Sequence, residues 1–335
     1  MNKMFWMCVT VAALMAVTAA PAAEDDAKFS EEIPEDEARF AGVFPDGVKT
    51  VACISPASYP GGSRYRRGVE LLEKAGLAVK VMPHAFTRPE RGKGPAPLAF
   101  RLEDFYAAWN DPEVDMIVCI RGGRGSGKLL ENLDWNRLEN RPDLYFQGFS
   151  DITLITGALL AKGNGHPIAG PMAGTLPKLK EPFIREMAAM HHGETVGPYK
   201  VEPLVAGGFS GLPLAGHLER LTRLAASDCA PDVRGRVVFI ESVRTPPGQI
   251  REQLRTLIDR RFFDGAAGVV FCQFVKCGGA EEVDAVLEEC APGIGVPVCR
   301  GFPFGHSSRC ATIDFRRKVV VENDMLTFPA VAEGN

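Results

Sequence analysis

The chain has little histidine, and none of it lies at a spacing that binds metals. Six histidines are scattered through 335 residues, and neither they nor the nine cysteines form a C-x-x-C or H-x-x-x-H pair. Such pairs are the usual signature of a zinc site, so we expect no metal cofactor. A separate basic segment is also missing, because lysines and arginines are mixed with acidic neighbours and the formal net charge is −4. Nucleic acids, which bind to basic surfaces, are therefore not expected as partners.

No apolar stretch reaches the roughly 20 residues of a membrane-spanning helix. The longest covers residues 4–17; it follows Lys3 and precedes small residues that include Ala20-Pro21-Ala22. That arrangement is typical of a cleavable secretory signal and predicts a signal peptide over residues 1–23. We therefore expect a periplasmic or secreted protein that has no membrane anchor after cleavage.

Cysteine is more frequent, but its pattern establishes no disulfide. Loss of Cys8 with the signal would leave eight cysteines, an even number that is compatible with disulfides in an oxidising compartment. Cys277 and Cys310 lie in loop-like segments and are the better candidates for a bridge. Four others lie in or beside apolar runs and are interpreted as small buried hydrophobic residues: Cys53, Cys119, Cys272 and Cys299.

The composition, with 46% hydrophobic and 24% charged residues, is typical of globular proteins. The sequence contains a succession of strand and helix patterns. After an acidic leader over 24–47, the patterns alternate through 48–175, which predicts an α/β domain with an open parallel sheet and helices on both faces. The periodicity fades over 176–210, interpreted as a crossover linker. Residues 211–330 predict a smaller mixed α/β domain that ends in an antiparallel hairpin turning at Asn323-Asp324.

The segment RGGRGSGKLL, residues 121–130, is the main candidate for chemistry. It follows the apolar segment VDMIVCI, so we expect a strand, a glycine-rich turn and then a helix that begins near Ser126. A serine at such a turn can act as a nucleophile, amides of the first helical turn can stabilise an oxyanion, and the flanking Gly125 and Gly127 allow a tight backbone. Two alternatives remain open: Ser126 could be a helix N-cap, or the segment could be a P-loop in which Leu129 replaces the metal-binding hydroxyl.

A serine nucleophile needs a base, usually a histidine that is oriented by a carboxylate. His306 lies in the loop GFPFGHSS after a short apolar strand, and α/β folds place reacting groups in such loops. Glu241 ends the apolar segment VVFIE, where a carboxylate is unexpected. Both residues also allow a structural interpretation, since Glu241 could cap the following turn and His306 could be a solvated loop residue.

Taken together, these segments resemble the LD-carboxypeptidase family of serine peptidases, which includes muramoyltetrapeptide carboxypeptidases and microcin C self-immunity peptidases. The resemblance covers about residues 48–328 and rests on ordered motifs: ISPAS, RGG and GS around Ser126, GFSDIT at 148–153, VFIES, GVVFCQF and GFPFGH. It implies a Rossmann-like N-terminal domain that carries the nucleophile Ser126. It also implies a smaller C-terminal domain that supplies the acid Glu241 and the base His306.

The implied reaction removes a terminal D-alanine from the L-centre of the diamino acid in a murein tetrapeptide, through an acyl-enzyme in a metal-independent homodimer. Gly127 would donate the first oxyanion hydrogen bond, with Gly123 and Arg124 as further substrate contacts. Four positions depart from the family pattern: HGP reads AGP at Ala169, GGNL reads AGHL at His217, Arg124 replaces an aromatic residue before GS, and Ser307 replaces the glycine after His306. These departures leave two alternatives, a hydrolase for another amide such as an aminoacyl-nucleotide antibiotic, and a non-catalytic periplasmic peptide-binding protein.

Overall fold

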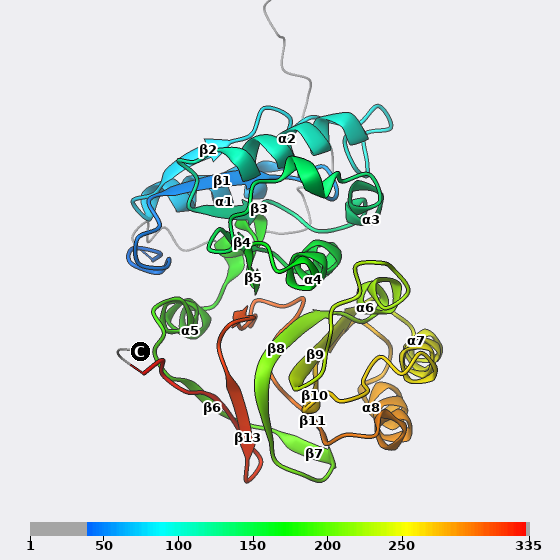
Figure 1. The fold of residues 1–335 in the computed structure, drawn as a ribbon. Coiled ribbons are helices and arrows are strands. Elements are labelled where there is room, and N and C mark those ends of the chain that lie inside the picture. The colour runs from blue at the N-terminus through cyan, green and yellow to red at the C-terminus, as the bar shows by residue number, and fades with distance from the viewer. Residues whose placement is uncertain (1–38, 333–335) are drawn as a thin grey trace, which may run out of the picture.

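The computed structural model describes residues 39–332. The predicted signal peptide and most of the predicted acidic leader lie outside these residues. The described chain forms a six-stranded sheet and an eight-stranded sheet, both accompanied by helices, drawn in the upper and lower halves of Figure 1. This arrangement confirms the predicted α/β fold. Within residues 39–332, no helix has the length and apolarity that crossing a membrane requires.

The first sheet has the strand order β12-β5-β4-β3-β1-β2. Its five parallel strands are β1 (Thr50–Ile54), β2 (Ala78–Val81), β3 (Met116–Cys119), β4 (Tyr145–Gln147) and β5 (His166–Ala169). All residues of β3 and β5 are buried, as expected for parallel strands with both faces covered. The helices that connect the strands are α1 (Ser63–Lys74), α2 (Leu98–Asn110), α3 (Ser126–Leu130) and α4 (Thr153–Lys162).

Two of these helices show how burial follows from the sequence. In α1, the buried residues Tyr65, Val69 and Leu72 recur every three or four positions, so one stripe of the helix faces the sheet. In α4, the first seven residues are all buried, because this helix contacts β5 on one side and α6 and β8 of the second half on the other. The apolar segment of α4 therefore packs between the two halves of the molecule.

The sixth strand of the first sheet comes from the other end of the chain. β12 (Ile313–Asp314) pairs antiparallel with β5 through Ile313 and Ala169. The expected boundary at about residue 211 placed this segment in the C-terminal domain. A two-residue strand is too short to show a period in the sequence. The pairing of this C-terminal segment with the first sheet was therefore not predicted.

The second sheet has the order β6-β14-β13-β8-β9-β10-β11-β7. Its parallel strands are β8 (Phe209–His217), β9 (Arg236–Val243), β10 (Gly268–Val275) and β11 (Val298–Arg300), and antiparallel partners are β6 (Val196–Lys200), β7 (Glu202–Val205), β13 (Val319–Glu322) and β14 (Met325–Phe328). Its helices are α6 (Leu218–Leu224), α7 (Pro247–Asp259) and α8 (Ala280–Cys290). Short 3₁₀ helices are η2 (Trp135–Arg137), η3 (Ser150–Ile152), η4 (Ala173–Lys178) and η5 (Ala291–Ile294).

The structure contains the predicted hairpin, whereas the segment predicted as a linker contains a helix and two strands. Asn323 and Asp324 have positive φ angles of 51° and 59° between β13 and β14, as a two-residue hairpin turn requires. The segment 176–210, interpreted as a linker, instead contains α5 (Glu181–His191) and the strands β6 and β7 at the two edges of the second sheet. Prolines are tolerated in such edge strands, and they obscured the strand pattern here.

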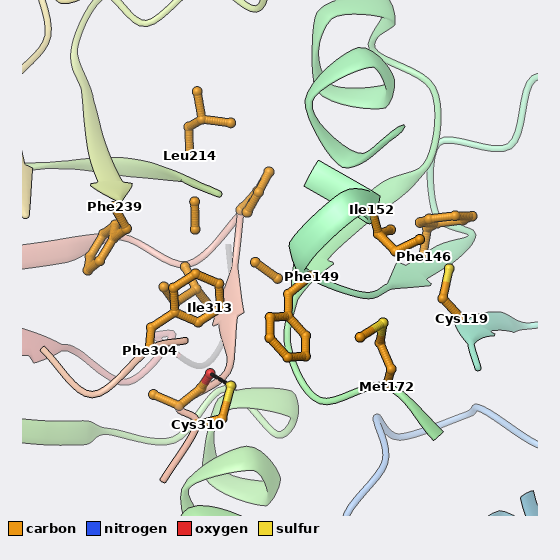
Figure 2. Packing of buried hydrophobic residues seen from close by; sticks show 14 of the residues in the cluster. Cys119, Phe146, Phe149, Ile152, Met172, Leu214, Phe239, Phe304, Cys310 and Ile313 are labelled. Atoms are coloured by element: carbon orange, nitrogen blue, oxygen red, sulfur yellow. Dashed lines mark hydrogen bonds between the residues drawn. The ribbon is translucent and has the colours of Figure 1, made fainter. Parts of the chain in front are cut away.

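The two halves are joined by a hydrophobic core. Figure 2 shows Phe149 of the first half beside Phe304 of the second. Their ring centroids lie 6.2 Å apart, and both side chains are buried. Since Phe149 directly precedes Ser150, this core also holds Ser150 in place relative to the second half.

Every cysteine in residues 39–332 is a free thiol. The expectation that Cys277 and Cys310 form a bridge is therefore wrong, and both are buried. Cys277 is part of the hydrophobic core, and its Sγ atom contacts the Val275 carbonyl oxygen at 3.5 Å. The four cysteines of the apolar runs lie as predicted in or beside the core, with Cys272 the most accessible of them.

Candidate active site

Three side chains from distant segments form a continuous hydrogen-bonded chain. The Nδ1 atom of His306 lies 2.7 Å from Glu241 Oε2, and Nε2 lies 2.9 Å from Ser150 Oγ. Glu241 is fully buried on β9, whereas Ser150, at the start of η3, and His306, in a loop, are half-buried. Because the carboxylate accepts the Nδ1 proton, Nε2 is left to accept the proton of the Ser150 hydroxyl. Hydroxyl, imidazole and carboxylate in this order make a serine nucleophilic.

The backbone at Ser150 is unusual. Ser150 has a φ angle of 66°, in the left-handed region that few residues other than glycine occupy. It is the first residue of η3, between β4 and α4, so it occupies a sharp strand-to-helix turn of the kind that exposes a nucleophile. The sequence pattern, a polar residue between an apolar strand and a helix, favours Ser150 as the N-cap of that helix. An N-cap has extended backbone angles, so the structure contradicts this prediction.

The glycine-rich turn lies directly against Ser150. A Cβ atom on Gly122 would be 2.9 Å from Ser150 Cβ and 3.1 Å from Ser150 Oγ. The strands that precede the two turns, β3 and β4, are parallel neighbours, so both turns lie at the same edge of the sheet. The RGG and GFSDIT motifs therefore meet at one point, and only glycine fits at position 122 without displacing Ser150.

Ser126, the predicted nucleophile, does not pair with His306. Its side chain is fully buried, and its Oγ has no hydrogen-bond partner in the described part of the chain. Its Oγ also makes no capping bond, since Gly125 is the N-cap of α3. Ser126 and Ser150 follow neighbouring strands at similar turns, and the sequence could not show which of the two faces His306. The available signal was that Ser150, like Ser126, follows an apolar strand and precedes a helix.

The other residues predicted in this turn have different positions. Gly127 lies within α3 and packs against α6, where a Cβ atom would meet Arg223 Nη2 at 2.3 Å. No contact joins Gly127 to Ser150 in the described residues, so its predicted oxyanion role is not supported. Gly123 and Arg124 are exposed and follow Gly122, next to Ser150. The amide of Arg124 donates to Ser58 Oγ at 2.9 Å, which anchors the turn.

Asp151, which the sequence reasoning missed, connects three parts of the site. Its buried carboxylate accepts hydrogen bonds from the Ser126 amide at 2.9 Å and from Arg220 Nε at 2.6 Å. Arg220 lies on α6 and also donates to the Gly123 carbonyl oxygen at 3.3 Å. Asp151 therefore ties the Ser150 turn to the glycine-rich turn and to the second half. Its only sequence signal was its place after Ser150 in GFSDIT.

His217 lies beside the three-residue chain. It ends β8, is paired with Glu241 of β9, and its ring centroid is 5.9 Å from that of His306. Burial lowers the pKa of His217, and the Glu241 carboxylate opposes that shift. Ala169, the second departure from the family pattern, is buried within β5. Of these two positions, His217 is thus the one that contacts the candidate site.

Comparison with known proteins matches both halves to one family. The profile described as the LD-carboxypeptidase N-terminal domain covers residues 51–170, and the profile of the LD-carboxypeptidase C-terminal domain covers residues 210–321. Ser150 falls within the first, and Glu241 and His306 fall within the second.

Several known proteins are similar to this chain. A Streptomyces coelicolor protein named as a carboxypeptidase is 31% identical, over 79% of this chain and 87% of its own. The murein tetrapeptide carboxypeptidase of Pseudomonas aeruginosa is 26% identical, over 82% and 94%. The microcin C7 self-immunity protein of Escherichia coli is 24% identical, over 83% and 91%. The crystal structure of muramoyltetrapeptide carboxypeptidase from Oxalobacter formigenes has a TM-score of 0.72 at 23% identity, covering 84% of this chain and 100% of that one.

Proposed function

This chain belongs to the LD-carboxypeptidase family of serine peptidases, and on that premise we propose that it hydrolyses the terminal L,D-peptide bond of a murein tetrapeptide, with Ser150 as the nucleophile. The observation that carries the proposal is the hydrogen-bonded chain from Ser150 through His306 to Glu241. Its geometry matches what a serine hydrolase needs, a hydroxyl within reach of an imidazole that a buried carboxylate orients.

In the proposed reaction, Ser150 Oγ attacks the carbonyl carbon of the L-centre while its proton passes to His306 Nε2. Glu241 holds the ring and stabilises the imidazolium. His306 then donates this proton to the nitrogen of the departing D-amino acid as the C–N bond breaks. A water molecule, deprotonated by His306, attacks the resulting ester, and its collapse returns the proton to Ser150.

The developing oxyanion needs hydrogen-bond donors close to Ser150. In enzymes with a nucleophile at a strand-to-helix turn, the amide after the nucleophile is one donor, which assigns Asp151 N here. The second donor in our proposal is the amide of Gly123, supported by the contact of its neighbour Gly122 with Ser150. These two amides replace that of Gly127 in our prediction from sequence.

We also propose that the enzyme acts outside the cytoplasm, as a homodimer. The apolar run at 4–17 and the small residues after it support export, and the family resemblance supports the dimer. An exported enzyme would meet murein peptide stems directly.

The test compares two serine variants in release of D-alanine from a murein tetrapeptide. Ser150→Ala should lower kcat by about 10⁴-fold or more, the usual effect of removing a serine nucleophile. Ser126→Ala should leave kcat nearly unchanged, because the hydroxyl it removes has no partner in the described residues. Full activity of Ser150→Ala, with loss of activity in folded Ser126→Ala, would restore Ser126 as the nucleophile and reject this proposal.

A second candidate keeps the same three residues but cleaves an amide of an aminoacyl nucleotide. His217 beside the site and the match to the microcin C7 self-immunity protein favour it. Supplying both substrate types to the wild-type protein and measuring release of the amino acid separates the two candidates. A binding protein would release neither product.

A further inference from the structure

Basic side chains from three separate segments gather around the glycine-rich turn. Residues 59–67, 88–94 and 121–124 contain eight lysines and arginines and one acidic residue, Glu90. We call six of them the basic rim: Arg64, Arg88, Arg91, Lys93, Arg121 and Arg124.

Contacts between these three segments place them side by side. The amide of Tyr59 donates to the Gly94 carbonyl oxygen at 2.7 Å, and Arg121 Nη1 donates to the Tyr59 carbonyl oxygen at 2.9 Å. The guanidinium carbons of Arg64 and Arg121 lie 4.6 Å and 5.4 Å from the centre of the same Tyr65 ring. The basic rim is therefore a feature of the tertiary structure, although its members are up to about 60 residues apart in sequence.

Five of the six positive charges of the basic rim lack acidic partners in the described part of the chain. Within residues 39–332, five of its members form no ion pair with a carboxylate: Arg88, Arg91, Lys93, Arg121 and Arg124. Elsewhere in the chain arginine does form ion pairs with carboxylates, and Arg300 pairs with three of them. Like charges held together repel one another, and an anion bound among them relieves that repulsion.

The basic rim also adjoins the reacting group. Arg121 and Arg124 stand on either side of Gly122 and Gly123, and Gly122 contacts Ser150. Arg124 is exposed, so its guanidinium is open to a ligand. The Debye length at physiological ionic strength is about 8 Å, so a substrate carboxylate bound directly against these side chains would be attracted with little screening.

We propose that the basic rim binds the free carboxylates of the peptide substrate and makes the enzyme selective for anionic peptides. This inference rests on the proposed function, because it takes Ser150 as the point of attack. A murein tetrapeptide offers carboxylates at its D-glutamate and at its terminal D-alanine, and amidation of D-glutamate removes one negative charge. The phosphate of an aminoacyl nucleotide presents similar anionic oxygens, so the test includes both sources.

The experiment measures D-alanine release from a free tetrapeptide and from the same peptide amidated at D-glutamate. Arg124→Gln should raise KM for the free peptide by about three- to tenfold, as expected for one exposed charge pair, and Arg124→Glu should raise it further. The value of kcat should stay unchanged. With the amidated peptide the increase should be smaller, and added salt should diminish the difference between the two peptides.

The matched control is Arg260→Glu, which reverses another exposed arginine at the C-terminal end of α7. The 13 residues of α7 begin shortly after Glu241, so Arg260 lies about 20 Å further along the helix axis. This control should leave both peptides unaffected. An equal loss on both peptides for Arg124→Glu, or a fall in kcat alone, overturns the inference.

A binding measurement separates this inference from the proposed function. Peptide affinity is measured on Ser150→Ala protein with and without Arg124→Glu. If the wild-type protein releases no D-alanine but binding still depends on Arg124 and on the free carboxylate, the proposed function fails and the basic rim stands. If adenosine monophosphate binds in an Arg124-dependent way and the peptide does not, the carboxylate assignment is overturned.

Discussion

Replacing Gly122 by alanine should impair catalysis without unfolding the protein. The added Cβ atom would lie 2.9 Å from Ser150 Cβ, 3.1 Å from Ser150 Oγ and 3.4 Å from the Phe149 carbonyl oxygen. Carbon atoms in contact are normally separated by about 3.5–4.0 Å, so an overlap of about 0.6 Å with Ser150 must be relieved by movement of one turn or the other. Either movement disturbs the 2.9 Å bond from Ser150 to His306.

The expected magnitude follows from that displacement. A shift of about 1 Å in a reacting group can lower the rate by about 100-fold, so about half that shift should lower kcat by about tenfold or more. Overpacking of this kind destabilises a protein by about 1–3 kcal/mol, which a folded domain of this size tolerates. The assays are kcat for D-alanine release and a urea denaturation curve recorded on the same preparation.

Gly248→Ala is the matched control. Gly248 is exposed in the first turn of α7, and a Cβ atom there would have no neighbour within 4 Å. Alanine favours helix over glycine, so this variant should keep wild-type kcat and gain a few tenths of a kcal/mol in stability. If Gly122→Ala keeps wild-type kcat, or loses activity only in proportion to its unfolded fraction, the inferred contact between the glycine-rich turn and Ser150 is refuted.

Three further predictions concern the framework of the site. Asp151→Ala removes the acceptor of the Ser126 amide and of Arg220 Nε, while Glu219 and the Gly123 carbonyl oxygen still hold the Arg220 guanidinium, so the unfolding free energy should fall by about 1–3 kcal/mol. Asp151→Asn should lose less, and equal losses would contradict the ionic role. Asp314→Ala removes the 2.7 Å hydrogen bond between Asp314 and His166, which links β12 to β5. The same denaturation assay should show that the unfolding free energy falls by about 1–3 kcal/mol, and an unchanged midpoint would argue against this link. Cys229 should react with a thiol reagent faster than the other seven described cysteines, because burial raises the pKa of the half-exposed Cys272 thiol well above its usual value and the remaining six are buried. Mass spectrometry of the labelled peptides checks this, and a reductant-sensitive melting temperature would instead reveal a disulfide.

Much of the fold could be predicted because local patterns determine it. The apolar segments of β1, β3 and β9 became buried strands, and Asn323-Asp324 formed the hairpin turn that its residue types favour. Glu241 and His306 could also be recognised as candidate catalytic residues. A carboxylate is unexpected at the end of an apolar strand, and a histidine in a glycine-rich loop after a strand lies where α/β folds place reacting groups. The structure places these two side chains 2.7 Å apart.

Other features could not be read from the sequence, because they depend on which segments meet in space. Two serines stand at similar strand-to-helix turns, and only the packing of the second half on the first brings Ser150, and not Ser126, to His306. The two-residue strand β12 and the basic rim are likewise assembled from segments whose own patterns are unremarkable in isolation. The sequence by itself determined the strands, the helices and the residue types of the site. The tertiary structure decided which serine is paired with the histidine and where the unpaired positive charges gather, since both depend on contacts between residues far apart in the chain.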